Sequence, residues 1–384
     1  MTPINSDLTD SAAPGAASAD RPFRVLCLDG GGMRGVYQVA FLAAFTDRTH
    51  RLEGRTNNFD VGRAFDLVVG TSTGGIVACA LASGISLQKI HDLYRDRGPC
   101  IFPFQTLRAI PYLGSVLIRA NSALLWLGNR ALRKALNDTF RDLTVGNVYD
   151  KRGVALAVPA IAMSRHHPVV FKTPHMARLN GRDNSRYLAD VCLATSAAPI
   201  LRSMARIPEP GSPDAYEVYA DGGLWANNPG VIGVVEASEM LNEAGDRERP
   251  IHLFMLGNIP AQGGEELRGW NLHRGALGWR FGLRALAASL DAQSEGYDYI
   301  ANKVAALRSR QSFAYRFPAG CPSSELRKLL ENMDDARPKA IEALTRQAIA
   351  DADLAWSQLD SSVELRSFFD AISNAPILSR QSEC

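Results

Sequence analysis

The sequence predicts an α/β fold, in which helices pack on the faces of a β-sheet. From residue 23 onward, short runs of β-branched and apolar residues alternate with longer stretches whose apolar residues recur at helical spacing. This alternation is typical of a sheet covered by helices. The composition, 46% hydrophobic and 21% charged, is that of an ordinary globular protein.

The expected elements follow one another in a regular order. Six apolar runs are predicted to be strands: 23–28, 65–70, 153–161, 168–172, 216–220 and 251–256. The stretches between them are predicted to contain helices: 33–46, 73–83, 86–96, 122–140, 185–195 and 230–244. After a glycine-rich loop, a further strand is expected at 312–317, and helices at 276–308, 323–333 and 337–357.

These elements suggest three parts of the chain. Residues 1–22 are rich in Ala, Ser, Asp and Pro and lack the basic start and apolar core of a signal peptide, so we expect a disordered tail. Residues 23–260 carry the alternating pattern and are expected to form the main domain. Residues 261–384 are mainly helical in pattern and are expected to pack on that domain as a C-terminal layer.

Charge and cysteine usage narrow the function classes. The 42 basic and 40 acidic residues give a net charge of +2, which provides no global attraction to nucleic acid. The six cysteines lie far apart without a CxxC pair, as expected of free thiols in a reducing compartment. The most apolar stretch, 110–128, is interrupted by Pro111, Arg119 and Asn121, so no spanning helix is predicted. We therefore expect a soluble, cytoplasmic protein.

The first motif is a glycine-rich loop between a predicted strand and a predicted helix. Gly30, Gly32 and Gly35 match the GxGxxG pattern of dinucleotide-binding loops. That pattern alone is a weak signal, and the acidic residue expected at the end of the following strand is missing. Consecutive backbone N–H groups at a helix N-terminus can also bind other anions.

The second motif, Gly70-Thr71-Ser72-Thr73-Gly74, also lies between a predicted strand and a predicted helix. In a nucleophile elbow, a serine occupies such a turn, and the glycines on either side permit close approach of the backbone. The alternative is an ordinary glycine-rich turn in which Ser72 caps the helix. The flanking strand and helix favour a nucleophile.

A serine nucleophile needs a base, and none of the seven histidines lies in a convincing loop after a late strand. His166 and His167 are expected in a surface turn, and His252 in the core. The third motif supplies an aspartate instead: Asp221, followed by Gly222 and Gly223, ends an apolar strand. A simple Asp-Gly-Gly turn is the alternative.

A Ser72–Asp221 pair has two chemical requirements. A free aspartate has a pKa of about 3.9, so the carboxylate must be partly desolvated and within hydrogen-bonding reach of the hydroxyl. The tetrahedral oxyanion also needs strong stabilisation, and each well-aimed donor can contribute roughly 3 to 4 kcal/mol in the transition state. The N–H groups of the glycine-rich loop could provide it.

Together these motifs resemble those of the patatin-like phospholipases. The similar segments occur in the family's order and cover about residues 23–260: Asp29–Gly35, Gly70–Gly75, Ala194–Pro199, Asp221–Gly223 and Asn227–Pro229. The resemblance implies a three-layer sandwich with a central, mostly parallel sheet. It further implies Ser72 as nucleophile, Asp221 as base, and Gly31 and Gly32 as oxyanion donors. Arg34 would contact a lipid phosphate, although a simply exposed arginine is the alternative.

The reaction implied by this resemblance is hydrolysis of a glycerophospholipid ester through an acyl-serine intermediate, without a metal or cofactor. The enzyme would then bind the inner membrane peripherally while active. Segments 101–128 and 270–284 could contact lipid, or could simply close over the sheet. Some bacterial members are activated by a cyclic dinucleotide in antiphage defence, so we consider the same activator here.

Other functions remain open on sequence alone. A housekeeping or neutral-lipid esterase of the same fold would carry the same motifs. A nucleotide-dependent oxidoreductase would use the glycine-rich loop but would leave the serine and aspartate motifs unexplained. A non-catalytic scaffold would have no need of Ser72 and Asp221. The lipid headgroup, the acyl position and the oligomeric state are not predicted.

Overall fold

The computed structural model describes residues 21–54, 59–102, 122–258, 268–279, 281–317, 319–320, 326 and 335–378. Its strands are β1 (Phe23–Leu28), β2 (Leu67–Gly70), β3 (Ala155–Ala162), β4 (His167–Lys172), β5 (Ala205–Glu209), β6 (Ser212–Asp221), β7 (Ile251–Leu256) and β8 (Phe313–Arg316). The main helices are α1 (Gly35–Glu53), α2 (Thr73–Ala82), α3 (Leu87–Asp92), α7 (Ser122–Phe140), α8 (Val145–Arg152), α9 (Leu188–Thr195), α11 (Gly230–Glu243), α12 (Leu283–Arg308), α14 (Pro338–Ser357) and α15 (Val363–Ser373). Shorter turns of helix include η1 (Gly32–Arg34), η3 (Leu93–Arg97), α4 (Gly98–Ile101), α10 (Gly223–Ala226) and η5 (Gly269–Leu272).

The strands form one mixed sheet in the order β5-β6-β3-β2-β1-β7-β8, and β4 pairs with β3. Five of these strands run parallel to one another, namely β3, β2, β1, β7 and β8. β4 and β6 pair antiparallel with β3, and β5 pairs antiparallel with β6. The predicted mostly parallel sheet is therefore confirmed.

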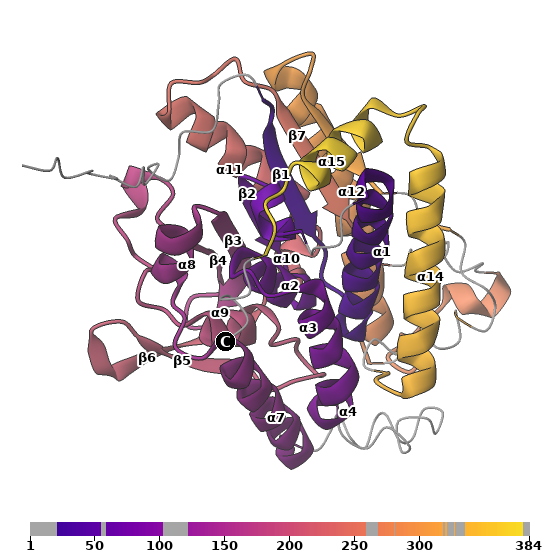
Figure 1. The fold of residues 1–384 in the computed structure, drawn as a ribbon. Coiled ribbons are helices and arrows are strands. Elements are labelled where there is room, and N and C mark those ends of the chain that lie inside the picture. The colour runs from indigo at the N-terminus through magenta and orange to yellow at the C-terminus, as the bar shows by residue number, and fades with distance from the viewer. Residues whose placement is uncertain are drawn as a thin grey trace, which may run out of the picture.

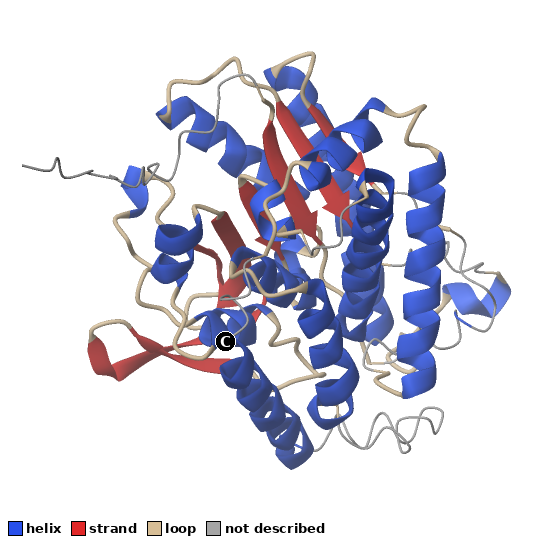
Figure 2. Ribbon diagram, in the orientation of Figure 1, coloured by secondary structure: helices blue, strands red, loops and turns tan. Residues whose placement is uncertain are grey.

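Helices cover both faces of this sheet (Figures 1 and 2). Leu26 and Leu28 of β1 belong to the core formed with α1, α2, α9, α14 and α15, whereas Val25 and Cys27 belong to the core formed with α11 and α12. Alternate residues of a strand point to opposite faces, so a strand buried on both sides is apolar throughout. This produces the expected three layers.

The C-terminal part of the chain contributes to both the sheet and its helical cover. β8 extends the parallel sheet next to β7. α14 lies alongside α1 at the right of Figure 1, and α15 crosses near the upper end of both. Phe368 of α15 is fully buried against Phe45 of α1 and Phe254 of β7. Part of the core is thus completed by residues far along the chain.

Several predicted boundaries were wrong. The helix expected at 33–46 begins at Gly35, after a 3₁₀ turn, and continues to Glu53, where Gly54 ends it with a φ of 66°. The helix expected at 86–96 is interrupted by the π-helical turn Leu93–Arg97. The helix expected from 276 begins only after Gly282, whose φ is 91°. Left-handed backbone of this kind cannot continue a helix and suits glycine.

Among the strands and the helices of eight or more residues in the described part of the chain, the sequence prediction missed three, namely β5, α8 and α15. β5 contains a proline and pairs only with β6, as expected of an edge strand with a weak sequence pattern. α8 is eight residues long, too short for a clear helical period. The helix predicted at 323–333 lies almost entirely outside the described residues, as does most of the apolar stretch at 110–128.

Candidate active site

Ser72 occupies the turn between β2 and α2, with a φ of 55° and a ψ of −124°. This conformation is unfavourable for a residue with a side chain and occurs where surrounding contacts enforce it. The neighbouring glycines show what enforces it here. A Cβ on Gly70 would lie 2.2 Å from the Gly74 carbonyl oxygen, and one on Gly74 would lie 2.4 Å from that of Leu28. The turn can be this tight only because both positions lack side chains.

The backbone of this turn is fixed by hydrogen bonds from outside it. The Ser72 N–H donates to Thr195 Oγ1 at 2.9 Å, and that hydroxyl donates to the Pro159 carbonyl at 2.7 Å. The Thr71 hydroxyl donates to the Ala226 carbonyl at 2.6 Å. Thr195 lies within the 194–199 segment that contributed to the family resemblance, but its contact with Ser72 was not predicted.

Asp221 lies at the end of β6 and accepts a hydrogen bond of 2.6 Å at Oδ2 from the Ser72 hydroxyl. Its other carboxylate oxygen accepts from the Gly223 N–H at 2.6 Å. Ser72 is 8% exposed and Asp221 is 5% exposed. The structure therefore brings together the two residues chosen from separate sequence motifs, with the hydroxyl bonded directly to the carboxylate.

Asp221 reaches Ser72 through the pairing of an antiparallel strand. β6 runs antiparallel to β3, which places Asp221 beside the carboxyl end of β3. β6 overlaps only the last residues of β3, and Asp221 pairs with Ala160. Val69 of β2 pairs with Ala157 of β3, and Ala160 lies three residues after Ala157 along β3. Ser72 likewise lies three residues beyond Val69, so it is level with Asp221.

Burial dominates the electrostatics of Asp221. It raises the pKa of the carboxyl group to about 6, while the hydrogen bonds from Ser72 and Gly223 and the positive charge of Arg202 act in the opposite direction. Arg202 also lies over the ring of Phe102, with its guanidinium carbon 4.6 Å from the ring centroid. A carboxylate with this pKa binds a proton more readily than a free aspartate does.

The glycine-rich loop lies directly against the Ser72 turn. A Cβ on Gly30 would lie 3.1 Å from Ser72 Cβ and 2.6 Å from Asn227 Oδ1. The Gly30 N–H donates to the Asn227 carbonyl at 3.0 Å. Within the described part of the chain, the N–H groups of Gly31 and Gly32 donate to no backbone carbonyl. Both residues follow directly in the chain after Gly30.

Arg34 lies in the turn η1 that follows these glycines, rather than in the first turn of α1. Its side chain is half-buried, and burial lowers its pKa, whereas Asp291 of α12 acts to raise it. The alternative of a simply exposed arginine is therefore wrong. Gly35 approaches a different group, because a Cβ there would lie 2.6 Å from the Tyr94 hydroxyl oxygen.

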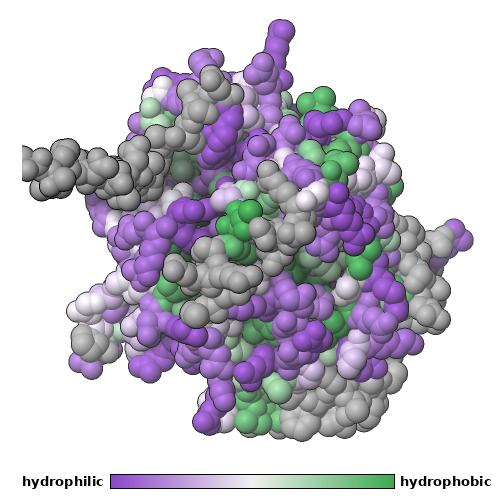
Figure 3. All heavy atoms as spheres, in the orientation of Figure 1, coloured by the Kyte–Doolittle hydropathy of each residue, from purple (hydrophilic) through white to green (hydrophobic). Residues whose placement is uncertain are grey.

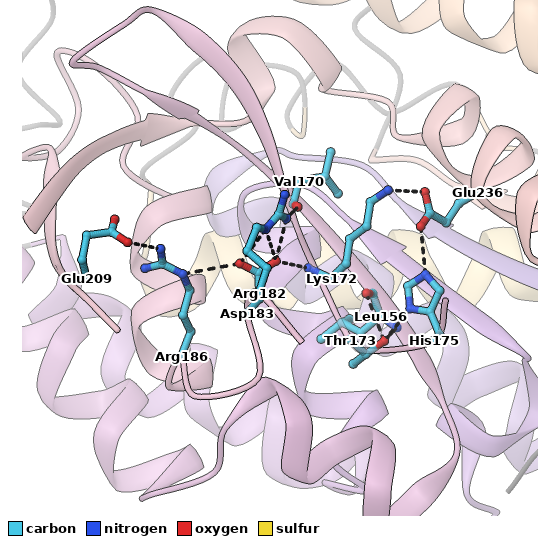
Figure 4. Close-up of polar contacts among 10 residues, drawn as sticks. All are labelled: Leu156, Val170, Lys172, Thr173, His175, Arg182, Asp183, Arg186, Glu209 and Glu236. Carbon is cyan, nitrogen blue, oxygen red and sulfur yellow. Dashed lines mark hydrogen bonds and ion pairs between the residues drawn. The ribbon is translucent and has the colours of Figure 1, made fainter. Parts of the chain in front are cut away.

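His175 and His252 make polar contacts away from Ser72. His175 has a fully buried side chain and pairs through Nε2 with Glu236 of α11 at 2.8 Å, and Lys172 of β4 also pairs with this carboxylate, as Figure 4 shows. His252, expected in the core, is half-buried and contacts Ser367 through Nδ1 at 2.7 Å. The Ser72 hydroxyl bonds to Asp221, and not to a histidine, in agreement with the predicted pair.

Metal clusters and membrane-spanning helices are both absent from the part of the chain that the structure describes. Among the described residues, no group of three or more His, Cys, Asp or Glu side chains could hold a metal ion. In the same part of the chain, none of the helices has the length and apolar character needed to cross a bilayer. Figure 3 shows a face on which hydrophobic residues form small groups among polar ones.

The fold and this site define an α/β protein with a nucleophile-elbow serine bonded to a carboxylate. Comparison with known families is consistent with that class, because residues 26–230 match the model described as patatin-like phospholipase. This match spans more than half of the chain. The protein belongs to the patatin-like phospholipase family.

Three similar proteins are each named cGAMP-activated phospholipase. That of Escherichia coli (strain TW11681) is 31% identical over 63% of this chain and 64% of its own length. That of Vibrio cholerae serotype O1 is 36% identical over 56% and 57%, respectively. That of Pseudomonas aeruginosa (strain BWHPSA011 / Pa011) is 31% identical over 72% and 74%. The match thus covers less than two thirds of the first two relatives.

Proposed function

We propose that this protein is a lipid acyl hydrolase of the phospholipase A type, which cleaves glycerophospholipid esters by means of Ser72 and Asp221. The observation that carries the proposal is the hydrogen bond of 2.6 Å between the buried Ser72 hydroxyl and Asp221 Oδ2. The related phospholipases support the choice of a lipid ester as substrate.

In the proposed first half-reaction, Asp221 accepts the hydroxyl proton while Ser72 Oγ attacks the ester carbonyl carbon. The N–H groups of Gly31 and Gly32 stabilise the resulting oxyanion. The tetrahedral intermediate collapses with proton transfer from Asp221 to the departing oxygen. The products are a lysophospholipid and an acyl group bound to Ser72.

The second half-reaction uses the same groups with water as the nucleophile. Asp221 accepts a proton from the water that attacks the acyl carbonyl carbon. It then gives this proton to Ser72 Oγ as the ester bond between Ser72 Oγ and the acyl carbon breaks. A fatty acid is released and the free enzyme is restored. The raised pKa of Asp221 suits this alternation between accepting and donating a proton.

Arg34 is proposed to bind the phosphate of the lipid, close to the glycine-rich loop from which it extends. Gly30, Gly35, Gly70, Gly74, Gly222 and Gly223 are proposed to support the site by permitting close backbone approach. At Gly222, for example, a Cβ would lie 2.2 Å from the Pro159 carbonyl oxygen. No cofactor takes part in the proposed reaction.

Peripheral membrane binding is proposed to bring the site to its substrate. The candidate segment 270–284 carries five exposed large apolar residues among its described positions: Trp270, Leu272, Leu277, Trp279 and Phe281. Arg274 lies over the Trp279 ring, with its guanidinium carbon 5.7 Å from the centroid. Aromatic residues mixed with cations suit the interface of an anionic bilayer. Within the other candidate segment, Trp126 and Leu127 of α7 are also exposed.

A cyclic dinucleotide is proposed as the activator, on the strength of the three relatives named cGAMP-activated. The test is lipid mass spectrometry of the products formed from mixed bacterial phospholipids, with and without a panel of cyclic dinucleotides. Stimulation by one of them is expected. Equal activity across the panel would count against this regulation, and release of fatty acids from neutral lipids alone would favour the esterase alternative.

The proposed catalytic pair is tested in the same assay with purified variants. Ser72→Ala and Asp221→Asn are each expected to abolish fatty-acid release while the circular dichroism spectrum is unchanged. A fluorophosphonate probe should label the wild-type protein and fail to label Ser72→Ala. Full activity in either variant would refute the pair, and labelling that persists in Ser72→Ala would place the reactive serine elsewhere.

A further inference from the structure

Asp29, the residue before the three glycines, forms an ion pair with an arginine 287 positions later in the chain. Nη1 of Arg316, on β8, donates to Asp29 Oδ2 at 3.0 Å. The Asp29 side chain is 7% exposed and that of Arg316 is 29% exposed. Burial raises the pKa of Asp29, and Arg316 opposes this effect. The arginine therefore favours the charged form of a buried carboxylate at the entrance to the glycine-rich loop.

Arg316 is itself held in place from two sides. Its Nε donates to Asp298 Oδ1, on α12, at 3.1 Å. On the other side, a Cβ on Gly257 would lie 2.4 Å from Arg316 Nη1, so the guanidinium fills space left by a missing side chain. Two carboxylates and the nearby backbone of Gly257 fix the planar guanidinium group. A lysine side chain, with a single flexible ammonium group, cannot make the same set of contacts.

The rest of the loop entrance is anchored through its backbone. Gln38 Nε2 donates to the Asp29 carbonyl at 2.9 Å and to the Leu256 carbonyl at 3.0 Å. The Asn258 side-chain amide donates to the Gly30 carbonyl. After these anchored positions come Gly31 and Gly32, whose N–H groups are the donors assigned above to the oxyanion. Their direction thus depends on how Asp29 is held.

We propose that Arg316 is a positioning residue for the hydrolysis: it fixes Asp29 and thereby aims the N–H groups of Gly31 and Gly32 at the oxyanion. This inference rests on the proposed function of the Ser72–Asp221 pair. Arg316 bonds to Asp29 and Asp298, and not to Ser72 or Asp221, so it would act through the loop. Its effect should appear mainly in kcat, because the oxyanion forms only as the ester is attacked.

The test compares Arg316→Lys with wild-type protein, using a soluble p-nitrophenyl ester so that membrane binding does not contribute. We expect kcat to fall at least about tenfold. Loss of a single oxyanion donor typically lowers kcat by a factor of about 10²–10³, and a misaligned donor loses part of the same stabilisation. KM should change by less than about threefold, since ground-state binding is not affected. The pH at which activity is half-maximal should not move, because Asp221 is unchanged.

A second variant guards against misfolding caused by an unpaired buried charge. Asp29→Asn combined with Arg316→Met removes both charges together, and it should show the same selective loss of kcat. The matched control is Arg152→Lys, since Arg152 makes a comparable buried pair with Asp60 at 2.6 Å, away from the loop. That variant should lose thermal stability but retain wild-type kcat per folded molecule.

The outcomes separate this proposal from the one on which it rests. Wild-type kcat in both Arg316 variants, in a protein that Ser72→Ala inactivates, would overturn the positioning role alone. An equal loss of kcat in the Arg152→Lys control would also overturn it, because any weakened ion pair would then have the same effect. Activity that survives in Ser72→Ala would instead overturn the proposed function.

Discussion

Thr195 holds the backbone of Ser72 by accepting its N–H at Oγ1 over 2.9 Å. The same hydroxyl donates to Pro159, inside β3, and the Gly222 N–H donates to the Thr195 carbonyl at 3.2 Å. One residue at the end of α9 therefore links the serine turn, the central sheet and the residue that follows Asp221. The relative positions of Ser72 and Asp221 depend on this link.

Replacement of Thr195 by valine keeps its shape and removes its hydroxyl, which leaves the Ser72 N–H without its acceptor. We expect Thr195→Val to lower the free energy of unfolding by about 1 to 3 kcal/mol and to reduce kcat. Chemical denaturation and ester hydrolysis measure the two effects. Thr195→Ser keeps the hydroxyl and should retain most of the activity. Equal behaviour of the two variants would show that the hydroxyl has no such role.

The pH dependence of activity should follow the ionisation of Asp221, because only its deprotonated form can accept the serine proton. Burial raises the pKa of this group to about 6. We expect kcat/KM for a soluble ester to rise with pH, to be half-maximal at about pH 6 and to level off above it. Arg202→Gln should move the rise to higher pH, because the positive charge of Arg202 lowers the pKa of Asp221. A rise centred near pH 4 in wild-type protein would contradict this assignment.

Asp221→Asn should stabilise the protein at neutral pH although it abolishes activity. The pKa is higher in the folded state than in the unfolded chain, so ionisation of Asp221 destabilises the folded state as pH rises through the interval from about 4 to 6. An elevation from 3.8 to about 6 corresponds to roughly 3 kcal/mol. We therefore expect a gain of about 1 to 3 kcal/mol at pH 8, measured by denaturation, that vanishes below pH 4. A gain of the same size at both pH values would exclude this cause.

The strained backbone of Ser72 should be relieved by glycine and not by alanine. Both replacements remove the hydroxyl, but only glycine adopts a φ of 55° and a ψ of −124° without strain. We expect Ser72→Gly to be more stable than Ser72→Ala by about 1 kcal/mol, in thermal or chemical unfolding. At the exposed Ala350, in the interior of α14, replacement by glycine should instead cost about 1 kcal/mol. Equal stability of the two Ser72 variants would show that the turn is not strained.

Vesicle binding should depend on the exposed aromatic residues of segment 270–284. Trp279→Ala combined with Phe281→Ala should reduce co-sedimentation with anionic phospholipid vesicles at least about tenfold, since each buried aromatic side chain contributes roughly 1.5 to 3 kcal/mol. The control is Tyr216→Ala, since Tyr216 is also exposed and also lies against an arginine, Arg206. Unchanged co-sedimentation of the double variant would remove this segment from the proposed membrane contact.

The fold class could be predicted because its signal is local. The apolar runs of β1 and β7 match the observed strands residue for residue, and the helical spacing at 122–140 matches α7. Boundaries failed where a turn or distortion in the backbone, as at Gly282 or in the π-helical turn after Asp92, set the end of a helix. Such features depend on packing as well as on residue type.

The sequence by itself determined the chemistry-bearing residues, because Ser72, Asp221 and the glycines each lie in a short motif whose residue types have a physical purpose. The tertiary structure decided their distances and support. Asp221 reaches Ser72 through the register of an antiparallel strand, and Arg316 reaches Asp29 from the other end of the chain. Local patterns specify which backbone turns form, whereas contacts across hundreds of residues depend on how the strands pair and on which side chains share the resulting buried space.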